Sequence, residues 1–235
     1  MNSSLQFIST FWSSSIGKKI VVAITGLILT LFLAGHLSGN MLIFVGEHAF
    51  NEYAYFLHHM LHGAGVWIAR IVLLTALVLH VVGTVQLTKM NRAAGQSYNT
   101  DGTQRSSFSS KIMIWSGLTI LAFIVYHILH YTARVGNEFN NPEKYEIMLD
   151  GHVAHNAYKM VIDGFSWLPA SIFYIIAVTL LCSHLSHGVA SIFQTLGLRT
   201  NKTEKLINTG AQVYSILIWV GFVSIPVSVL LHLVK

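Results

Sequence analysis

The chain has 235 residues, of which 53% are hydrophobic and only 10% are charged, whereas soluble domains carry charge at about a quarter of their positions. This composition excludes a disordered chain, a coiled coil and a nucleic-acid-binding domain, and the single cysteine, Cys182, cannot form an intrachain disulfide. The 13 histidines outnumber the 9 acids, and several of them lie inside apolar runs.

Five runs without Asp, Glu, Lys or Arg predict an all-α membrane protein with a single domain. A bilayer core of about 30 Å requires about 20 apolar residues in a helix. The runs cover residues 20–46, 71–88, 112–133, 164–198 and 206–234. They predict transmembrane helices near residues 20–43, 67–88, 112–132, 168–193 and 210–233, and the first run is too long for a signal peptide.

The connections between the predicted spans differ in charge. The segment before the first span and the loops after the second and fourth spans carry nine Lys or Arg and two acids, Asp101 and Glu204, whereas the other connections carry seven acids and five bases. The positive-inside rule therefore predicts a cytoplasmic N-terminus and an external C-terminus. We expect residues 1–17 to lie along the membrane interface, and residues 134–167 to hold a short amphipathic helix around residues 145–162.

Histidines within the spans are the most informative residues, because an ionisable side chain at membrane depth indicates a function. A single histidine can equally well bond to a neighbouring helix and have only a structural role. Here, however, each of the first four spans carries one or two: His36, His80, His127 with His130, and His184 with His187.

The depths of these histidines predict two pairs. At 1.5 Å per residue, His36 and His127 lie roughly 24–25 Å from the cytoplasmic edge, near the outer surface. His80 lies about 15 Å and His184 about 24 Å below the outer edge, in the middle to inner half. Two imidazole pairs at two depths in a four-helix core are the arrangement that holds two six-coordinate haems.

A zinc site or a proton relay would place the histidines differently. A zinc site needs three or four ligands at one depth, and no cysteine or carboxylate is placed to complete one. A proton relay of unliganded histidines stays open, but it does not require matched depths.

Glycines near the histidines favour particular ligands, because a small residue lets a porphyrin approach the backbone. Gly83 follows His80 by three residues, and Gly188 follows His184 by four. We therefore expect His80 and His184 to bind iron. The second members of the two i, i+3 pairs are expected to contact the haem or its propionates without binding iron: His130 and His187.

Motifs along nearly the whole chain resemble one known family. The most specific is His184-Leu-Ser-His-Gly188 followed by Ser191-Ile-Phe-Gln-Thr-Leu-Gly197. Others follow in matching order: Ser15-Ile-Gly-Lys-Lys19, Thr25-Gly-Leu27, Gly35-His-Leu-Ser-Gly-Asn40, Ala49-Phe-Asn-Glu-Tyr-Ala54, His80-Val-Val-Gly83, Gln86-Leu-Thr-Lys-Met-Asn-Arg92 with Tyr98, and Tyr126-His-Ile-Leu-His130. Together they resemble the five-helix, dihaem cytochrome b membrane subunit of succinate:quinone oxidoreductases and quinol:fumarate reductases.

The resemblance implies a protein of the bacterial cytoplasmic membrane with helices I–IV around two haems b. It implies that His36 and His127 bind the distal haem, and that His80 and His184 bind the proximal haem. It also implies two cytoplasmic partners, a flavoprotein with FAD and an iron–sulphur protein, in a complex that can be oligomeric. This chain would conduct electrons to menaquinone, since nothing in it predicts a dicarboxylate or FAD site.

One stretch departs from the family pattern. Relatives often place a carboxylate for quinone chemistry in or just after the first outer loop, where this chain reads Tyr55-Phe-Leu-His-His-Met60. We therefore expect His58 or His59 to do the proton work, with Asn40 or Arg70 as neighbours. The alternatives are an interfacial histidine face without quinone contact and a quinone site on the cytoplasmic side. Cys182 replaces the glutamate that serves a proton path in some fumarate reductases.

Three other functions remain alternatives for this sequence. The chain can be the cytochrome b subunit of a quinol:fumarate reductase. It can serve another membrane-bound dehydrogenase, such as a hydrogenase or a formate dehydrogenase, although the motif around His184 favours the succinate enzyme. It can also be a haem-free transporter or a passive anchor, with histidines lining a cavity.

Overall fold

A computed structural model describes residues 3–96 and 108–235, and only the backbone of residues 3–4, 7–8, 94–96 and 108–112. Tyr98, Asp101 and Arg105 lie outside the described residues. The elements are mostly helical: α1 (Ser3–Ser13), α2 (Ser15–Asn40), the 3-10 helix η1 (Met41–Phe44), α3 (Glu47–His59), α4 (Ala64–Gln96), α5 (Phe108–His127), the π-helix η2 (Ile128–Thr132), α6 (Pro142–Tyr145), β1 (Glu146–Leu149), β2 (His152–His155), α7 (Ala157–Ser166), α8 (Leu168–Thr195) and α9 (Glu204–Leu230).

Five helical segments are long and apolar enough to cross a membrane, and they confirm the five predicted spans. They are Ser15–Phe44, Ala64–Ala93, Met113–Thr132, Leu168–Thr195 and Glu204–Leu230. Most are longer than the predicted ranges, because helical hydrogen bonding continues beyond the apolar core into polar flanks that water can solvate. The chain is therefore a multi-pass helical protein in its described part.

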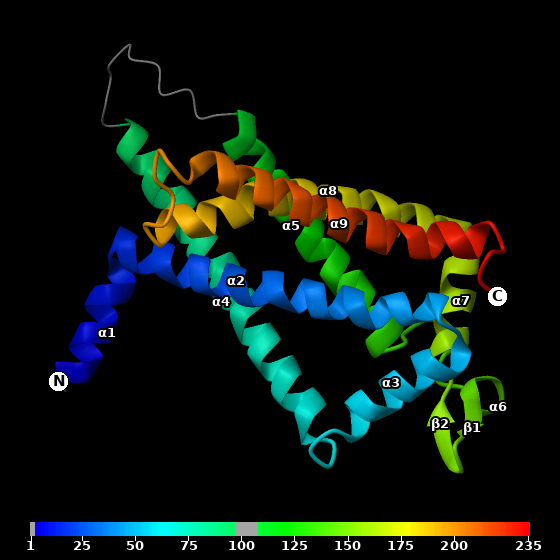
Figure 1. Cartoon of the computed structure of the whole chain (residues 1–235). Helices are drawn as coiled ribbons and strands as arrows, with labels where there is room; N and C mark the ends of the chain where they lie inside the picture. Colours follow the sequence, from blue (N-terminus) through cyan, green and yellow to red (C-terminus); the bar gives the residue numbers. More distant parts are fainter. Residues whose placement is uncertain (1–2, 97–107) are drawn as a thin grey trace.

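The helices that carry the four predicted ligands pack in the order α4, α2, α8, α5 (Figure 1). Among the described residues, α4 and α5 are not a closely packed pair, so a closed four-helix bundle is not what these contacts show. Helix α9 packs along α8 and also touches α2, where the Tyr214 hydroxyl donates to the Thr30 carbonyl at 2.6 Å. Helix α8 is thus the central element of the spanning part.

A sharp junction separates α1 from α2. The Ser14 side chain caps α2 by accepting a hydrogen bond from the Gly17 amide at 2.9 Å. A Cβ on Gly17 would lie 1.9 Å from the Phe11 carbonyl oxygen, so only glycine fits there. The buried Lys18 ammonium donates to the carbonyls of Trp12 and Ser13, which end α1 without further helical partners. Residues Ser3–Ser13 are therefore a separate helix, and the first span begins at Ser15.

Residues 41–63 and 133–167 form one layer at the end of the spans opposite to α1 (Figure 1), which we name the capping layer. The expectation of a helix around residues 145–162 was wrong for its first part, where β1 and β2 form an antiparallel hairpin. Asp150 and Gly151 both have positive φ, at 49° and 85°, and turn the chain between the strands. Helix α7 begins only after Asn156, whose side chain accepts from the Lys159 amide.

A buried asparagine joins the two parts of the capping layer. Asn51 on α3 is 0% exposed. Its amide donates to the Asn156 side chain at 3.1 Å, and its oxygen accepts from the Tyr158 amide at 2.9 Å. Asn156 in turn donates to the Glu47 carboxylate at 2.7 Å. The stretch that the resemblance places in an outer loop is therefore a helix, and it anchors α7.

Candidate functional site

His36 on α2 and His127 on α5 lie together near the capping layer. Their ring centroids are 5.9 Å apart, with the planes at 79°. Nδ1 of His127 is 3.2 Å from the Tyr174 hydroxyl of α8, which lies equally close to Nδ1 of His130. The Asn40 amide donates to the His36 carbonyl at 2.7 Å and stands 3.4 Å from Nδ1 of the same residue.

His80 on α4 and His184 on α8 form a second, more open pair. Nδ1 of His80 lies 3.2 Å from the Val22 carbonyl and 3.2 Å from the Thr25 hydroxyl, both on α2. Nδ1 of His184 lies 3.2 Å from the Ser116 hydroxyl on α5. The two imidazoles are close enough to interact electrostatically.

The two pairs stand at two levels of the spanning part. On α2, His36 follows the His80 partner Thr25 by 11 residues, which corresponds to about 16 Å. On α5, His127 follows the His184 partner Ser116 by 11 residues as well. Two independent helices thus give the same separation between the levels.

The ring nitrogens of the histidine pairs have the chemistry that is needed to bind a metal ion between two imidazoles. A backbone carbonyl can only accept, so the contact with Val22 places the proton of His80 on Nδ1 and leaves Nε2 with its lone pair. Metal-binding histidines are oriented by such bonds from the other ring nitrogen. Among the described residues, Nε2 of His80, His127 and His184 has no hydrogen-bond partner, whereas Nε2 of His36 lies 3.5 Å from the Asn40 amide. Metal–imidazole bonds are about 2 Å long, so the 5.9 Å between the ring centroids of His36 and His127 would leave room for one metal ion between the two rings.

The described residues do not form a metal site with three or more protein ligands. Among residues 3–96 and 108–235, no three His, Cys, Asp or Glu side chains converge to hold a metal ion. A haem ligated by two imidazoles needs only a pair, so this result does not bear on the two histidine pairs.

The glycines beside the inner pair differ from those that the sequence singled out. A Cβ on Gly26 would lie 3.2 Å from Cε1 of His80, and one on Gly117 would lie 3.7 Å from Cε1 of His184. A Cβ on Gly83 would instead meet Val22 at 2.7 Å, so Gly83 serves the close packing of α4 on α2. A Cβ on Gly188 would meet only its own helix's His184, at 4.0 Å. Gly26 and Gly117 were missed because the ring contacts cross between helices.

The remaining predicted site residues occupy separate places. His130 lies among aromatic rings, with its centroid 4.2 Å from that of Tyr131, and His187 is exposed on α8. His59 stacks on Tyr55 at 3.8 Å and bonds to its carbonyl. His58 interacts electrostatically with Arg70, with Arg134 and with His59. Asn40 contacts His36 instead. The contacts of the four predicted quinone residues therefore do not place all of them at one site.

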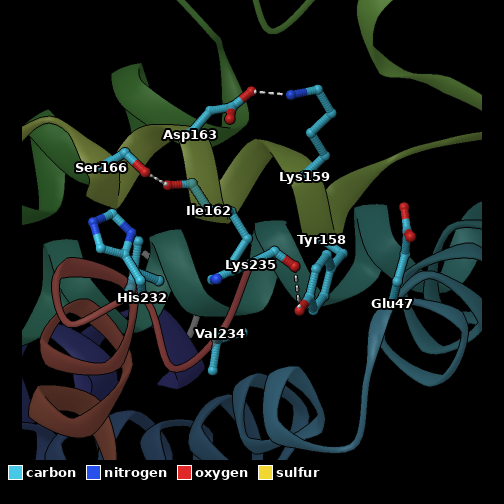
Figure 2. A pocket seen from close by; sticks show the side chains of 10 residues that line it. Glu47, Tyr158, Lys159, Ile162, Asp163, Ser166, His232, Val234 and Lys235 are labelled. Atoms are coloured by element: carbon cyan, nitrogen blue, oxygen red, sulfur yellow. Dashed lines mark hydrogen bonds and ion pairs between the residues drawn. The ribbon is translucent and has the colours of Figure 1, made fainter.

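A pocket of about 380 Å³ opens beside α7 and the end of α9 (Figure 2). Glu47, Lys159 and Asp163 line it, and the Tyr158 hydroxyl donates to the Lys235 carbonyl at 3.0 Å across it. Lys159 and Asp163 form an ion pair at 2.7 Å. None of the histidines of the two pairs borders this pocket.

Comparisons with models of protein families, with curated proteins and with solved structures find no match for this chain. The membrane character is supported by the five apolar helices. The two histidine pairs and the sequence motifs are therefore the basis on which a function can be assigned.

Proposed function

We propose that this chain is the membrane-anchor cytochrome b subunit of a succinate:menaquinone oxidoreductase, the succinate dehydrogenase of respiratory complex II. In this proposal His36 and His127 bind one haem b, and His80 and His184 bind the second, within a four-helix arrangement of α2, α4, α5 and α8. The observation that carries the proposal is the pair of levels about 16 Å apart, each with two imidazoles from different helices.

Haem ligated by two imidazoles supplies a one-electron couple in a low-dielectric environment. The chain's own contribution is to hold the four rings and to set their basicity. Val22 fixes the tautomer of His80, Ser116 orients His184, and Tyr174 orients His127. The apolar helices around these rings exclude water, which also favours electron transfer over side reactions.

The two ends of the spanning part have different proposed tasks. The end near α1 carries an excess of Lys and Arg, and we assign it to the cytoplasmic side, where the flavoprotein and the iron–sulphur protein would bind. Succinate oxidation belongs to the flavoprotein in this proposal. The chain receives electrons at this end and delivers them towards the capping layer, where menaquinone takes up two electrons and two protons.

The proton donor for menaquinone is proposed to be His58 or His59. His58 is supported by its electrostatic interaction with Arg70. His59 is supported by its exposure and by the aromatic stack that it forms with Tyr55. Asn40 belongs to the surroundings of His36 and would act beside the distal haem.

The absorbance of the purified chain tests the haem proposal directly. We expect a reduced-minus-oxidised difference spectrum of two low-spin b-type haems. A pyridine haemochrome assay should give half the haem content in His36→Ala and in His80→Ala. The control is His62→Asn, an exposed histidine on the α3–α4 connection, which should keep both haems. A featureless spectrum of the wild-type chain would refute the proposal and favour a haem-free anchor or transporter.

Co-purification tests the assignment to the succinate enzyme. The native complex should contain a flavoprotein that oxidises succinate and reduces a menaquinone analogue. A haem-containing complex that oxidises hydrogen or formate instead would place the chain with another dehydrogenase. Faster fumarate reduction than succinate oxidation, measured with the native quinone, would place it with the quinol:fumarate reductases.

The quinone proposal needs a variant that keeps the haems. The double variant His58→Ala/His59→Ala should lose quinone reduction while the haem content and the spectrum stay unchanged. Unchanged turnover in this variant would exclude both histidines from the proton transfer and would leave them as an interfacial surface.

A further inference from the structure

Four nitrogen-bearing side chains at the boundary between the capping layer and α4 are linked by electrostatic interactions through His58, and we name them the basic cluster: His58 of α3, Arg70 of α4, Arg134 after η2, and His155 of β2. His58 interacts electrostatically with both arginines, and His155 interacts with Arg134 and His58. The members come from four different elements, so the cluster exists only in the folded chain.

The basic cluster contains buried hydrogen-bonding atoms without partners. Nε of Arg134 and Nε2 of His155 are both buried and make no hydrogen bond. Within the described residues, neither Arg70 nor Arg134 has a carboxylate at ion-pair distance. A buried donor without an acceptor costs about 1–3 kcal/mol, and more for a charged group, so this arrangement favours a ligand that brings both acceptors and negative charge.

The backbone at Arg134 is strained. Arg134 has φ of +54°, a left-handed conformation that L-residues other than glycine rarely adopt. It follows the π-helix η2, whose wide turn ends with the Ala133 amide bonded to the Ile128 carbonyl at 2.7 Å. The guanidinium is held by one bond to the Asn140 side chain at 3.3 Å. Strain of this kind is concentrated at ligand-binding sites.

From these observations we infer that the basic cluster binds the phosphate group of an anionic phospholipid, with Arg70 and Arg134 as the charged partners and His155 as a hydrogen-bond partner. Both arginines stand at membrane ends of spans, since Arg70 lies near the beginning of the span Ala64–Ala93 and Arg134 lies two residues after the span Met113–Thr132.

The surroundings of Arg70 favour a lipid as the source of the phosphate. Its guanidinium lies 4.9 Å from the ring centroid of Trp67, which is 61% exposed, as expected of an aromatic residue at the membrane interface. Ile68 and Ile71 beside it are also exposed and apolar. A headgroup at the arginines would therefore have an apolar surface next to it for its acyl chains.

The ligand would also change the protonation of the neighbouring imidazoles. Burial lowers the pKa of His58, and the positive charges of Arg70 and Arg134 lower it further. Burial and the charge of Arg134 lower the pKa of His155 to about 4. A bound phosphate offsets these charges and raises both pKa values. If the proposed function holds, the lipid therefore helps His58 to carry a proton, but the binding itself does not depend on haem or quinone.

Native mass spectrometry of the full chain tests the inference. The protein is extracted from vesicles of phosphatidylcholine with a minor fraction of phosphatidylglycerol, and the retained lipid is counted. Arg70→Gln and Arg134→Gln should each lower phosphatidylglycerol retention about fivefold, which corresponds to about 1 kcal/mol per basic residue. Lys144→Gln and Lys159→Gln are matched controls in the same layer, because these lysines are already paired with Glu138 and Asp163.

The outcomes separate the alternatives. Equal retention in all five proteins would overturn the inference. Loss of phosphatidylglycerol on addition of millimolar inorganic phosphate would assign the site to a free ion, and loss on addition of a menaquinone analogue would assign it to the quinone. Because Arg134 has a strained backbone, Arg70→Gln on the regular helix α4 is the decisive variant if Arg134→Gln fails to fold. The haem spectra of these variants should stay unchanged, so a loss of lipid binding can be told apart from a failure of the haem proposal.

Discussion

Replacing Asn51 by alanine should open the capping layer and leave the spans closed. Asn51 is fully buried and accepts a hydrogen bond from the Tyr158 amide, which is one of the amides at the beginning of α7 that have no acceptor within the helix. Alanine leaves this amide buried and without an acceptor. The expected cost is about 1–3 kcal/mol, so local opening should become about 5- to 150-fold more frequent.

The cost should be limited to the contact between α3 and α7. The Asn156 side chain keeps its bonds to Glu47 and to the Lys159 amide, so it is not left without partners. Asn51→Asp retains an acceptor for the Tyr158 amide but cannot donate to Asn156. We therefore expect the Tyr158 amide to stay better protected in Asn51→Asp than in Asn51→Ala.

Hydrogen exchange resolved to single amides measures this effect. Exchange should accelerate over residues 47–59 and 146–166 in Asn51→Ala, and it should not change in the core of α8. Asn91→Ala is the control, because Asn91 is exposed on α4. Unchanged protection of the Tyr158 amide would refute the reasoning, and faster exchange throughout α8 would show that the capping layer is not a separate cooperative unit.

Three further predictions test other contacts. Gly35→Ala should stabilise α2 by about 1 kcal/mol in thermal unfolding, because its methyl group enters open space. Gly26→Ala should raise the stability less, because its methyl group would meet the His80 ring at 3.2 Å. Equal stabilisation by the two variants would contradict this contact. Tyr174→Phe should cost about 0.5–1.5 kcal/mol per lost hydrogen bond and should shift the midpoint potential of one haem in a redox titration, whereas unchanged potentials would argue against its orienting role. The pKa of His155 is lowered to about 4 from 6.5, so between these pH values the unfolded chain binds a proton that the folded chain does not, and the stability should fall from pH 6.5 to pH 4 and stay constant above pH 6.5. In His155→Gln, hydrogen exchange of the hairpin should lose this pH dependence of the stability. A retained dependence would assign it to another group.

The sequence predicted the spanning helices well because the membrane imposes a strong one-dimensional constraint. A helix in hydrocarbon must satisfy all its backbone groups internally and must avoid charge over about 20 residues, so runs without charge show where it lies. The same regularity, at 1.5 Å per residue, allowed the levels of His36, His80, His127 and His184 to be compared before any contact between them was known.

The capping layer was predicted less well, although one signal was present. Asp150-Gly151 is a pair that favours a tight hairpin turn, and it explains why residues 146–155 are strands and not helix. The amphipathic pattern was correct only for α7. The Asn156 cap decides where that helix begins. The amphipathic pattern alone does not show this start, because it extends over both the hairpin and α7.

The neighbours of each histidine were decided only by the tertiary structure. The sequence determined that this chain has five apolar spans and histidines at two depths, because both properties depend on composition and helical rise along single segments. It could not show that Gly26 and Val22 contact His80, or that Arg134 and His155 share a cluster with His58. Those contacts join residues that are tens of positions apart, and they depend on how helices cross and on where the loops return, for which a single chain carries no periodic signal.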